Sequence, residues 1–271
     1  MDLFSLPPIA AAFNAAYALV GGLTALFTPI AGAGAAAVAV IVLTMLVRTA
    51  LLPVGISQVK AEWTRRRLAP KLQALHRKYQ KNPQLLQQKT MALYKAEKAS
   101  PFAGILPALA QAPVLSLVYA LFLRTTVDGH ANALFDAHLF GVPLGTSFAH
   151  LIATGVLWPG VAVYAVLFAM MAAIAWLSRR GALRLALPKA PARVAVMRTT
   201  QSADPAAPLA NLSGILSWLP FITVVFAAFV SLAAALYLLA TTAWTLGERA
   251  ILRRKLWGEP GAETARPAVA G

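Results

Sequence analysis

Residues 35–56 read AAAVAVIVLTMLVRTALLPVGI, an apolar run in which Arg48 is the single charged residue. About 20 predominantly apolar residues are enough for a helix to cross the roughly 30 Å hydrocarbon core of a bilayer. The chain of 271 residues has the same character throughout, because 59% of it is hydrophobic and only 12% is charged. That is too little polar surface for a water-soluble globule of this size. The sequence therefore predicts a membrane protein.

The distribution of apolar residues predicts an all-α membrane protein with five transmembrane helices. Three spans stand apart, at residues 35–57, 104–124 and 158–177. A fourth apolar stretch, 215–246, is too long for one span, and we divide it near 229–231 into short spans at 213–229 and 231–247. The remaining segments are an external segment at 1–34, a cytoplasmic helical hairpin at 58–103, an external loop at 125–157, a cytoplasmic loop at 178–212 and a basic cytoplasmic tail at 248–271.

The basic residues predict the orientation in the membrane. The hairpin, the second cytoplasmic loop and the tail together hold 22 of the 24 Lys and Arg residues. By the positive-inside rule these segments are cytoplasmic, which puts the N-terminus outside and the C-terminus inside. Residues 8–30 are also apolar but have no cationic flank. We therefore expect a helix on the outer interface there, with a sixth span as the alternative.

The predicted hairpin consists of two basic, amphipathic helices. Leu72 and Tyr79 share a helix face, and Asn82 with Pro83 forms an N-cap and first-turn pair that starts the second helix, which ends before Ser100. A dense cationic face attracts phosphate at long range. We therefore expect a docking surface for an acidic or nucleic-acid partner such as the ribosome, with a solvated connector as the alternative; its residues are Arg65, Arg66, Arg67, Lys71, Arg77, Lys78 and Lys81.

Arg48 points to a wet groove inside the membrane. It lies nine residues before Ser57, roughly 13 Å along a helix, which is near mid-membrane. A cation at that depth needs water, lipid phosphate or polar groups around it, and all nine Asp and Glu residues fall outside the predicted spans. Alternatively, Pro53 and Gly55 end the helix early and Arg48 snorkels to the interface. The neutral groups that we expect to line the groove are Thr44, Gln111, Ser116, Tyr119 and Tyr237.

Five motifs, in this order and spacing, resemble the YidC family of membrane protein insertases. They lie in two regions, residues 35–122 and 216–256, that make up about half of the chain. The motifs are VLTMLVRTALLPV (42–54), LAPKLQALHRKYQ (68–80), LYKAEKASP (93–101), GILPALAQAPVLSLVYALF (104–122) and LAAALYLLATTAWTL (232–246). Two departures stand out. Ser231 occupies a position where many members have proline, and the segment before Ala35 is too short for the large extracytoplasmic domain of some members. The resemblance is therefore to the short form.

The resemblance implies an insertase and chaperone of the bacterial plasma (inner) membrane that makes and breaks no bond. A hydrophilic groove, made positive by Arg48, would take up hydrophilic segments of client proteins and release apolar segments into the bilayer. Gln111 and Tyr237 match groove-facing positions, and Arg253, Arg254 and Lys255 match a basic tail through which some members contact ribosomes. The implied partners are nascent membrane proteins, the ribosome, the Sec translocon, the signal recognition particle pathway and membrane lipids.

Three other functions fit the sequence less well. A small-solute transporter or channel is the main alternative, but no Asp or Glu lies in a predicted span and no inverted repeat is visible. An intramembrane protease built on Ser213 lacks a suitably placed histidine. The external histidines His130, His138 and His150 match no common metal-ligand spacing, and there is no Cys. We therefore expect no enzyme activity, no metal and no cofactor.

Overall fold

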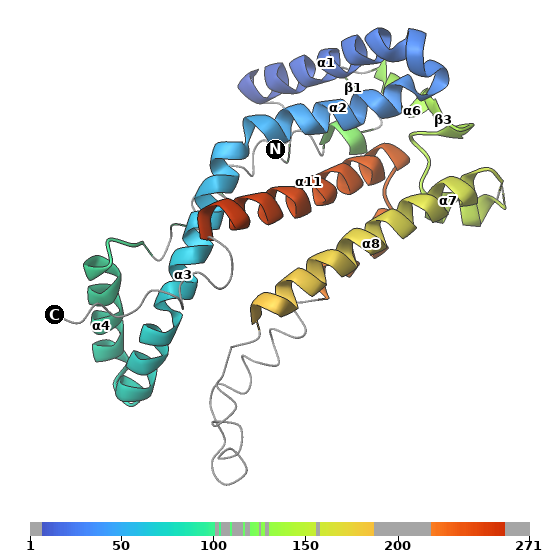
Figure 1. Ribbon diagram of the computed structural model, residues 1–271. Helices are drawn as coiled ribbons and strands as arrows, with labels where there is room; N and C mark the ends of the chain where they lie inside the picture. Colours follow the sequence, from blue (N-terminus) through green and yellow to red (C-terminus); the bar gives the residue numbers. More distant parts are fainter. Residues whose placement is uncertain are drawn as a thin grey trace. The chain divides into compact units, whose positions relative to one another are not determined.

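The computed structural model describes residues 7–100, 103, 109, 116, 120–124, 126–127, 130–155, 158–186 and 218–257, which are mostly helical. Figure 1 draws these residues as a ribbon coloured along the sequence. The chain divides into two compact units. The first unit combines Met1–Met45 with Tyr119–Leu246, and the second combines Leu46–Val118 with Gly247–Gly271. Most of the predicted second span and of the loop at 178–212 lies outside the described residues.

The two units share helices α2 and α11. In chain order, the first unit contains α1 (Pro7–Ala31), the 3-10 helix η2 (Gly32–Gly34), most of α2 (Ala35–Ala50), β1 (Thr126–Val127), β2 (His130–Ala131), α6 (Ala133–Asp136), β3 (His138–Leu139), β4 (Val142–Pro143), α7 (Phe148–Thr154), α8 (Gly160–Ala186), α10 (Leu219–Ala227) and most of α11 (Leu232–Trp257). The second contains the end of α2, α3 (Leu52–Tyr79), α4 (Pro83–Ala96) and the end of α11.

Two small β-hairpins correct the prediction of an all-α chain. They lie in the predicted external loop, where β1 pairs with β2 and β3 with β4, both antiparallel. Phe140 and Gly141 join β3 to β4 with φ angles of 50° and 81°, and positive φ at both central residues gives the tight turn that suits the twist of a hairpin. Each strand has only two residues, which is too short for an alternating pattern to show in the sequence.

The start of α11 is held by the segment 130–155, which contains β2 to β4. The N–H groups of Leu232 and Ala233 donate to the carbonyl oxygens of Thr146 and Leu144, at 2.8 and 2.9 Å. The next N–H, of Ala234, donates to the Ser231 hydroxyl oxygen at 3.3 Å. These are groups that a helix leaves without intrahelical partners in its first turn. The turn between α10 and α11, where the sequence predicts a break, is therefore closed by hydrogen bonds.

Two buried polar side chains bind residues 120–124, the described end of the predicted second span. The Ser231 hydroxyl donates to the carbonyl of Phe122 at 2.7 Å. Asn132, which is 2% exposed, donates from its amide to the carbonyls of Leu121 and Arg124, at 3.2 and 2.9 Å. Carbonyls at a helix end need such partners when they are buried. Ser231 therefore joins this end to the start of α11, and Asn132 joins it to the segment 130–155.

Helix α1 also contacts the segment 130–155. Phe13 and Val20 are buried, and the Tyr17 hydroxyl accepts a hydrogen bond from the N–H of Ala133 at 3.1 Å. The guanidinium of Arg124 lies 5.9 Å from the centre of the Phe13 ring. At 25 residues, α1 is about 37 Å long and could cross a bilayer, so the outer-interface position of residues 8–30 stays a prediction.

Two described stretches are long and apolar enough to cross a membrane, Ala10–Ala50 and Gly160–Leu183. They include most of the first and third predicted spans. Helix α8 continues past the predicted end at residue 177 to Ala186, and Arg179 and Arg180 in this extension lie over tryptophan rings, at 4.1 and 3.4 Å. Helix α10 packs against α8. The number of five spans remains a prediction. The described part of α10 has nine residues, which is too short to cross a bilayer, and α11 contains many polar residues.

The helix predicted for the first span is divided in the structure. The sequence predicts one helix over 35–57, but α2 ends at Ala50 and α3 begins at Leu52. Pro53, in the first turn of α3, has no N–H to donate to the carbonyl four residues earlier, which interrupts the ladder. Helix α3 then continues to Tyr79 as the first arm of the hairpin. The predicted start of α4 is confirmed, since the Asn82 side chain accepts from the N–H of Leu85 and Pro83 follows in the first turn.

Replacing Ser231 should destabilise the first unit. Ser231→Ala removes an N-cap acceptor and leaves the buried Phe122 carbonyl without that donor, so we expect a loss of about 1–3 kcal/mol in the free energy of unfolding. Thermal unfolding in detergent would measure it. Thr245→Ala is the matched control, because the Thr245 hydroxyl bonds only to a carbonyl of its own helix at 2.8 Å. Equal stability of the two variants would contradict this role.

Candidate functional site

The described residues of the predicted groove are divided between the two units. Thr44 and Tyr237 belong to the first unit, whereas Arg48 and Ser116 belong to the second. Gln111 and Tyr119 lie outside the described residues. A single groove formed by these six side chains therefore stays a prediction.

Thr44 and Tyr237 are packed in the core of the first unit. Thr44 is 1% exposed, and its hydroxyl donates to the carbonyl of Val40 at 2.7 Å. Such a bond to the preceding turn satisfies a hydroxyl without any external partner. Tyr237 is also buried, and its ring lies 5.5 Å from that of Phe122, tilted by 37°.

Arg48 lies in the last turn of α2 and is half-buried. The end of α2 at Ala50, with α3 beginning at Leu52, agrees with the alternative that Pro53 interrupts the first predicted helix. The helix end also supplies part of the stabilisation that the cation needs, since carbonyl dipoles at a C-terminus favour a positive charge by about 0.3–1 kcal/mol. How deep Arg48 lies in a bilayer stays a prediction.

All seven cations of the predicted docking surface are exposed. Three of them form ion pairs on the hairpin: Arg66 with Glu62 at 3.0 Å, and Arg67 and Lys71 with Glu97, the former at 2.9 Å. Arg67 also lies 5.0 Å from the centre of the Trp63 ring, and Lys78 lies over Tyr79. Among the described residues, no carboxylate pairs with Arg65, Arg77 or Lys81.

Glu97 links the end of α4 to the middle of α3. The hydrogen bond from Lys71, together with the nearby positive charges of Lys71 and Arg67, lowers the pKa of the Glu97 carboxyl below its usual value, although burial acts in the opposite direction. Glu97 is therefore ionised at neutral pH and holds two cations of α3 against the end of α4.

Lys98 ends α4 in a conformation that usually belongs to glycine. Its φ is 48°, in the left-handed region that costs a side-chain-bearing residue about 1–2 kcal/mol. The N–H of Ala99 donates to the carbonyl of Tyr94 at 2.9 Å, and the N–H of Lys98 to that of Lys95 at 3.2 Å. These two bonds define a Schellman motif, whose left-handed position is most often glycine. A lysine is held here despite the conformational cost.

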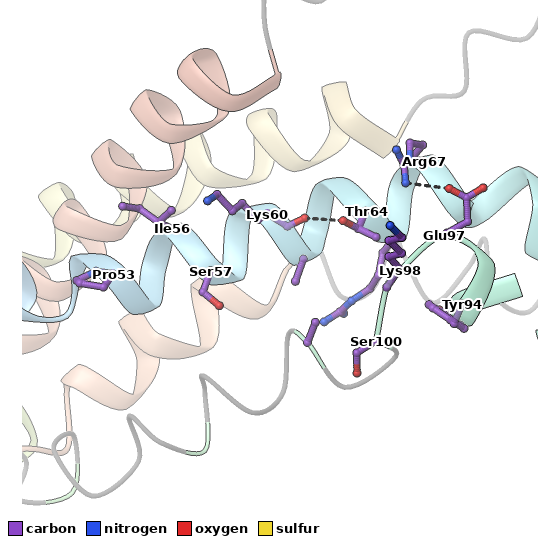
Figure 2. Close-up of a pocket in the computed structure, with 14 residues that line it drawn as sticks. Pro53, Ile56, Ser57, Lys60, Thr64, Arg67, Tyr94, Glu97, Lys98 and Ser100 are labelled. Atoms are coloured by element: carbon purple, nitrogen blue, oxygen red, sulfur yellow. Dashed lines mark hydrogen bonds and ion pairs between the residues drawn. The ribbon is translucent and has the colours of Figure 1, made fainter. Parts of the chain in front are cut away.

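A cavity of about 490 Å³ opens between α3 and the end of α4. Figure 2 shows side chains from both segments around it. Its lining combines apolar side chains with four cationic ones. The lining residues are Pro53, Ile56, Ser57, Lys60, Ala61, Thr64, Arg65, Arg67, Tyr94, Glu97, Lys98, Ala99, Ser100 and Ala103.

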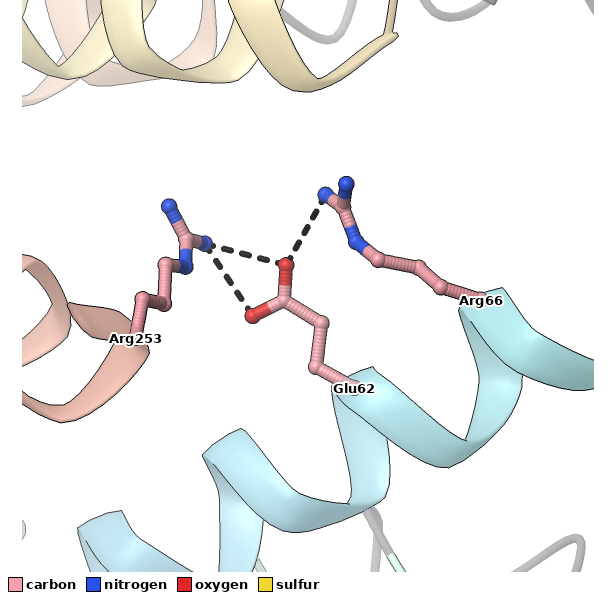
Figure 3. Close-up of polar contacts among 3 residues, drawn as sticks. All are labelled: Glu62, Arg66 and Arg253. Atoms are coloured by element: carbon pink, nitrogen blue, oxygen red, sulfur yellow. Dashed lines mark hydrogen bonds and ion pairs between the residues drawn. The ribbon is translucent and has the colours of Figure 1, made fainter. Parts of the chain in front are cut away.

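The end of α11 is fastened to α3 within the second unit. Glu62 lies between Arg253 and Arg66 (Figure 3), and both of its oxygens accept from Arg253 at 3.0 Å. One turn and a half earlier, α11 approaches α3 closely at Gly55, where an added Cβ would lie 1.6 Å from a carboxylate oxygen of Glu248. Arg253 is thus engaged with α3, whereas Arg254 and Lys255 are exposed.

Residues 27–259 match the model of the family described as 60Kd inner membrane protein. The chain belongs to this family. Similar proteins are the membrane protein insertase YidC 1 of Halalkalibacterium halodurans, 39% identical over 106 residues (38% of this chain, 41% of the relative), the membrane protein insertase YidC of Clostridium perfringens, 35% over 122 residues (45% and 51%), and the membrane protein insertase MisCA of Bacillus subtilis, 37% over 102 residues (36% and 39%).

These matches confirm the resemblance to the YidC family. Together with the long apolar stretches Ala10–Ala50 and Gly160–Leu183, they identify the chain as a membrane protein. The matched part spans about half the length of these relatives or less. What the relatives do as whole proteins therefore enters below as a proposal for this member of the 60Kd inner membrane protein family.

Sequence reasoning named neither Glu62, Glu97 nor Lys98 as a site residue. A signal for the first two was present, because they are the only acidic residues among eleven cations in the hairpin, and Glu62 precedes Arg66 by the four residues that bring side chains together on a helix. The pairing of Glu62 with Arg253, 191 positions away, depends on the fold. Nothing in the sequence indicates the left-handed backbone of Lys98.

Removing the charge of Glu62 should loosen the end of α11 from α3. We expect Glu62→Gln to speed hydrogen exchange of backbone amides in 247–257, because each Arg253 bond would lose its charge assistance. Hydrogen exchange measured by mass spectrometry checks this, with Asp136→Asn, an exposed acidic site of the first unit, as the control. Unchanged exchange in Glu62→Gln would show that the ion pair does not hold α11.

Acidification should weaken the contact between α3 and α4. The folded-state pKa of Glu97 is lowered, so its stabilising contribution is present above the unfolded value of about 4.3 and is lost as pH falls through the folded value. We expect amide exchange in 83–97, corrected for its intrinsic pH dependence, to rise below about pH 4. Glu97→Gln should remove this dependence, and a wild-type profile in that variant would contradict the assignment.

Proposed function

We propose that the chain is a membrane protein insertase that acts on nascent membrane proteins in the bacterial plasma membrane. The observation that carries the proposal is the family match over residues 27–259, together with a half-buried arginine at the end of an apolar helix. The similar proteins of Clostridium perfringens and Bacillus subtilis both bear the name membrane protein insertase.

In this proposal Arg48 is the charge that receives the client. Moving a carboxylate from water into a region of low dielectric is costly, and a nearby cation offsets part of that cost. A wet groove around Arg48 would shorten the hydrocarbon path of a hydrophilic client segment, while the apolar segment enters the lipid beside it. The remaining groove residues in the proposal are Thr44, Gln111, Ser116, Tyr119 and Tyr237.

Docking of the ribosome is the second part of the proposal. The exposed cations of the hairpin and of the end of α11 would attract ribosomal RNA by charge. Since Arg253 is engaged with Glu62, contact at the tail would fall mainly on Arg254 and Lys255. The Sec translocon and the signal recognition particle pathway would act upstream of, or beside, this chain, and the N-terminus would lie outside and the C-terminus in the cytoplasm.

Replacing Arg48 should impair insertion of clients with acidic translocated segments. A hydrogen bond to a charged group contributes about 1.5–3 kcal/mol, so we expect Arg48→Ala to lower insertion of such a client about tenfold or more. Arg48→Lys should largely preserve insertion, because the charge stays. The measurement is protease protection of a single-span client in proteoliposomes that contain the purified chain.

Arg249→Ala is the matched control, because Arg249 is an exposed arginine of the second unit outside the proposed groove. Insertion that is equal for Arg48→Ala, Arg48→Lys and the unmodified chain would show that the Arg48 charge is dispensable. A small-solute transporter or channel is the alternative function. Solute flux through the same proteoliposomes, with no insertion of the client, would replace the insertase proposal with that one.

A further inference from the structure

The cavity between α3 and the end of α4 carries a surplus of positive charge. Four lining residues are cationic and one is anionic. The anion, Glu97, is already held by Arg67 and Lys71. Among the described residues no carboxylate pairs with Lys60, Arg65 or Lys98. The cavity therefore favours an anionic ligand, and the hydroxyl of Ser57 offers it a neutral donor.

Lys98 gives an independent indication that this charge has a role. A Schellman turn is easiest with glycine at its left-handed position, yet a lysine occupies it at φ 48° and lines the cavity. A non-glycine residue in that region points to a constraint other than stability. The side chain is the only part of Lys98 that glycine would lack, and Lys98 lines the cavity.

The other part of the lining matches a lipid rather than a free ion. Pro53, Ile56 and Ala61 form an apolar part of the wall, and Pro53 and Ile56 lie in the first turns of α3, directly after the apolar helix α2. Tyr94 lies beside the basic part, and tyrosine is enriched where hydrocarbon meets water. Apolar, aromatic and cationic groups in this combination fit the glycerol and phosphate of a phospholipid, whereas inorganic phosphate would use only the last.

We propose that this cavity binds the phosphodiester head group of an anionic phospholipid, with Arg65 and Lys98 as its charged partners. A head group with a net negative charge is favoured over a zwitterionic one, because a choline cation would meet the same positive surplus. The proposal concerns the hairpin alone and does not depend on the insertase function.

The test is a titration of the full-length purified chain with phosphatidylglycerol or phosphatidylcholine, followed by native mass spectrometry. We expect phosphatidylglycerol to bind more tightly, and Lys98→Gln and Arg65→Gln each to weaken that binding about tenfold. Lys95→Gln is the matched control, because Lys95 is an exposed lysine on the same helix end outside the cavity lining. It should change binding less than twofold.

Lys98→Gly separates binding from folding. It removes the charge and relieves the left-handed strain, so we expect the hairpin to be at least as stable as in the unmodified chain while phosphatidylglycerol binding still falls about tenfold. The proposal is overturned if Lys98→Gly binds normally or if Lys95→Gln loses as much as Lys98→Gln. It is also overturned if inorganic phosphate or a ribosome, rather than the lipid, is the ligand whose binding depends on Lys98 and Arg65.

Discussion

The first turn of α11 carries the constraint on which the rest of the first unit depends. A backbone N–H at a helix start has no intrahelical partner, and near hydrocarbon water cannot replace one. Here three consecutive donors find acceptors in Thr146, Leu144 and Ser231, and Ser231 in turn donates to the carbonyl of Phe122. One turn thus joins α10, α11, the segment 130–155 and the described end of the predicted second span. The segment 130–155 contains short strands and helices, which hold the carbonyls of Thr146 and Leu144 at fixed positions.

In the second unit, Pro53 and Arg48 have a comparable structural role. The proline ends α2 shortly after Arg48, and this puts a positive charge at the helix terminus whose dipole favours it. A continuous helix would have left the charge to be stabilised by solvent and side chains alone. Helix α3 starts at the same break. Glu248 approaches it closely at Gly55, in its first turns, and Glu62, further along α3, accepts a hydrogen bond from Arg253. The position of the proline therefore influences both the charge and the packing of the second unit.

The sequence predicted those features that rest on local chemistry. The helix start at Asn82 and Pro83 was predictable because an N-cap and a first-turn proline act within four residues, and the break before Ser231 followed from an apolar stretch too long for one helix. The end of α2 was misplaced, since hydropathy does not distinguish a continuous helix from one that proline interrupts. Thr44 was predicted to line the groove, and the sequence did not indicate that its hydroxyl bonds to Val40 in a packed core. Contacts such as Arg253 with Glu62 join residues far apart in the chain, and no local pattern encodes them.

The charges of the hairpin determine which partner it can select. Glu62 and Glu97 each hold two cations, so Arg66, Arg67, Lys71 and Arg253 must lose a carboxylate before they can pair fully with an external anion. Among the described residues, no carboxylate pairs with Arg65 and Lys98, and none pairs with Arg77 and Lys81. An anion that meets this surface would therefore find available cations beside the cavity, at Arg65 and Lys98, and also at Arg77 and Lys81 around the end of α3. Net positive charge attracts every anion alike. The division into paired and available cations restricts the places where an anion can bind. The apolar wall next to Arg65 and Lys98 favours an anion that carries a hydrocarbon part.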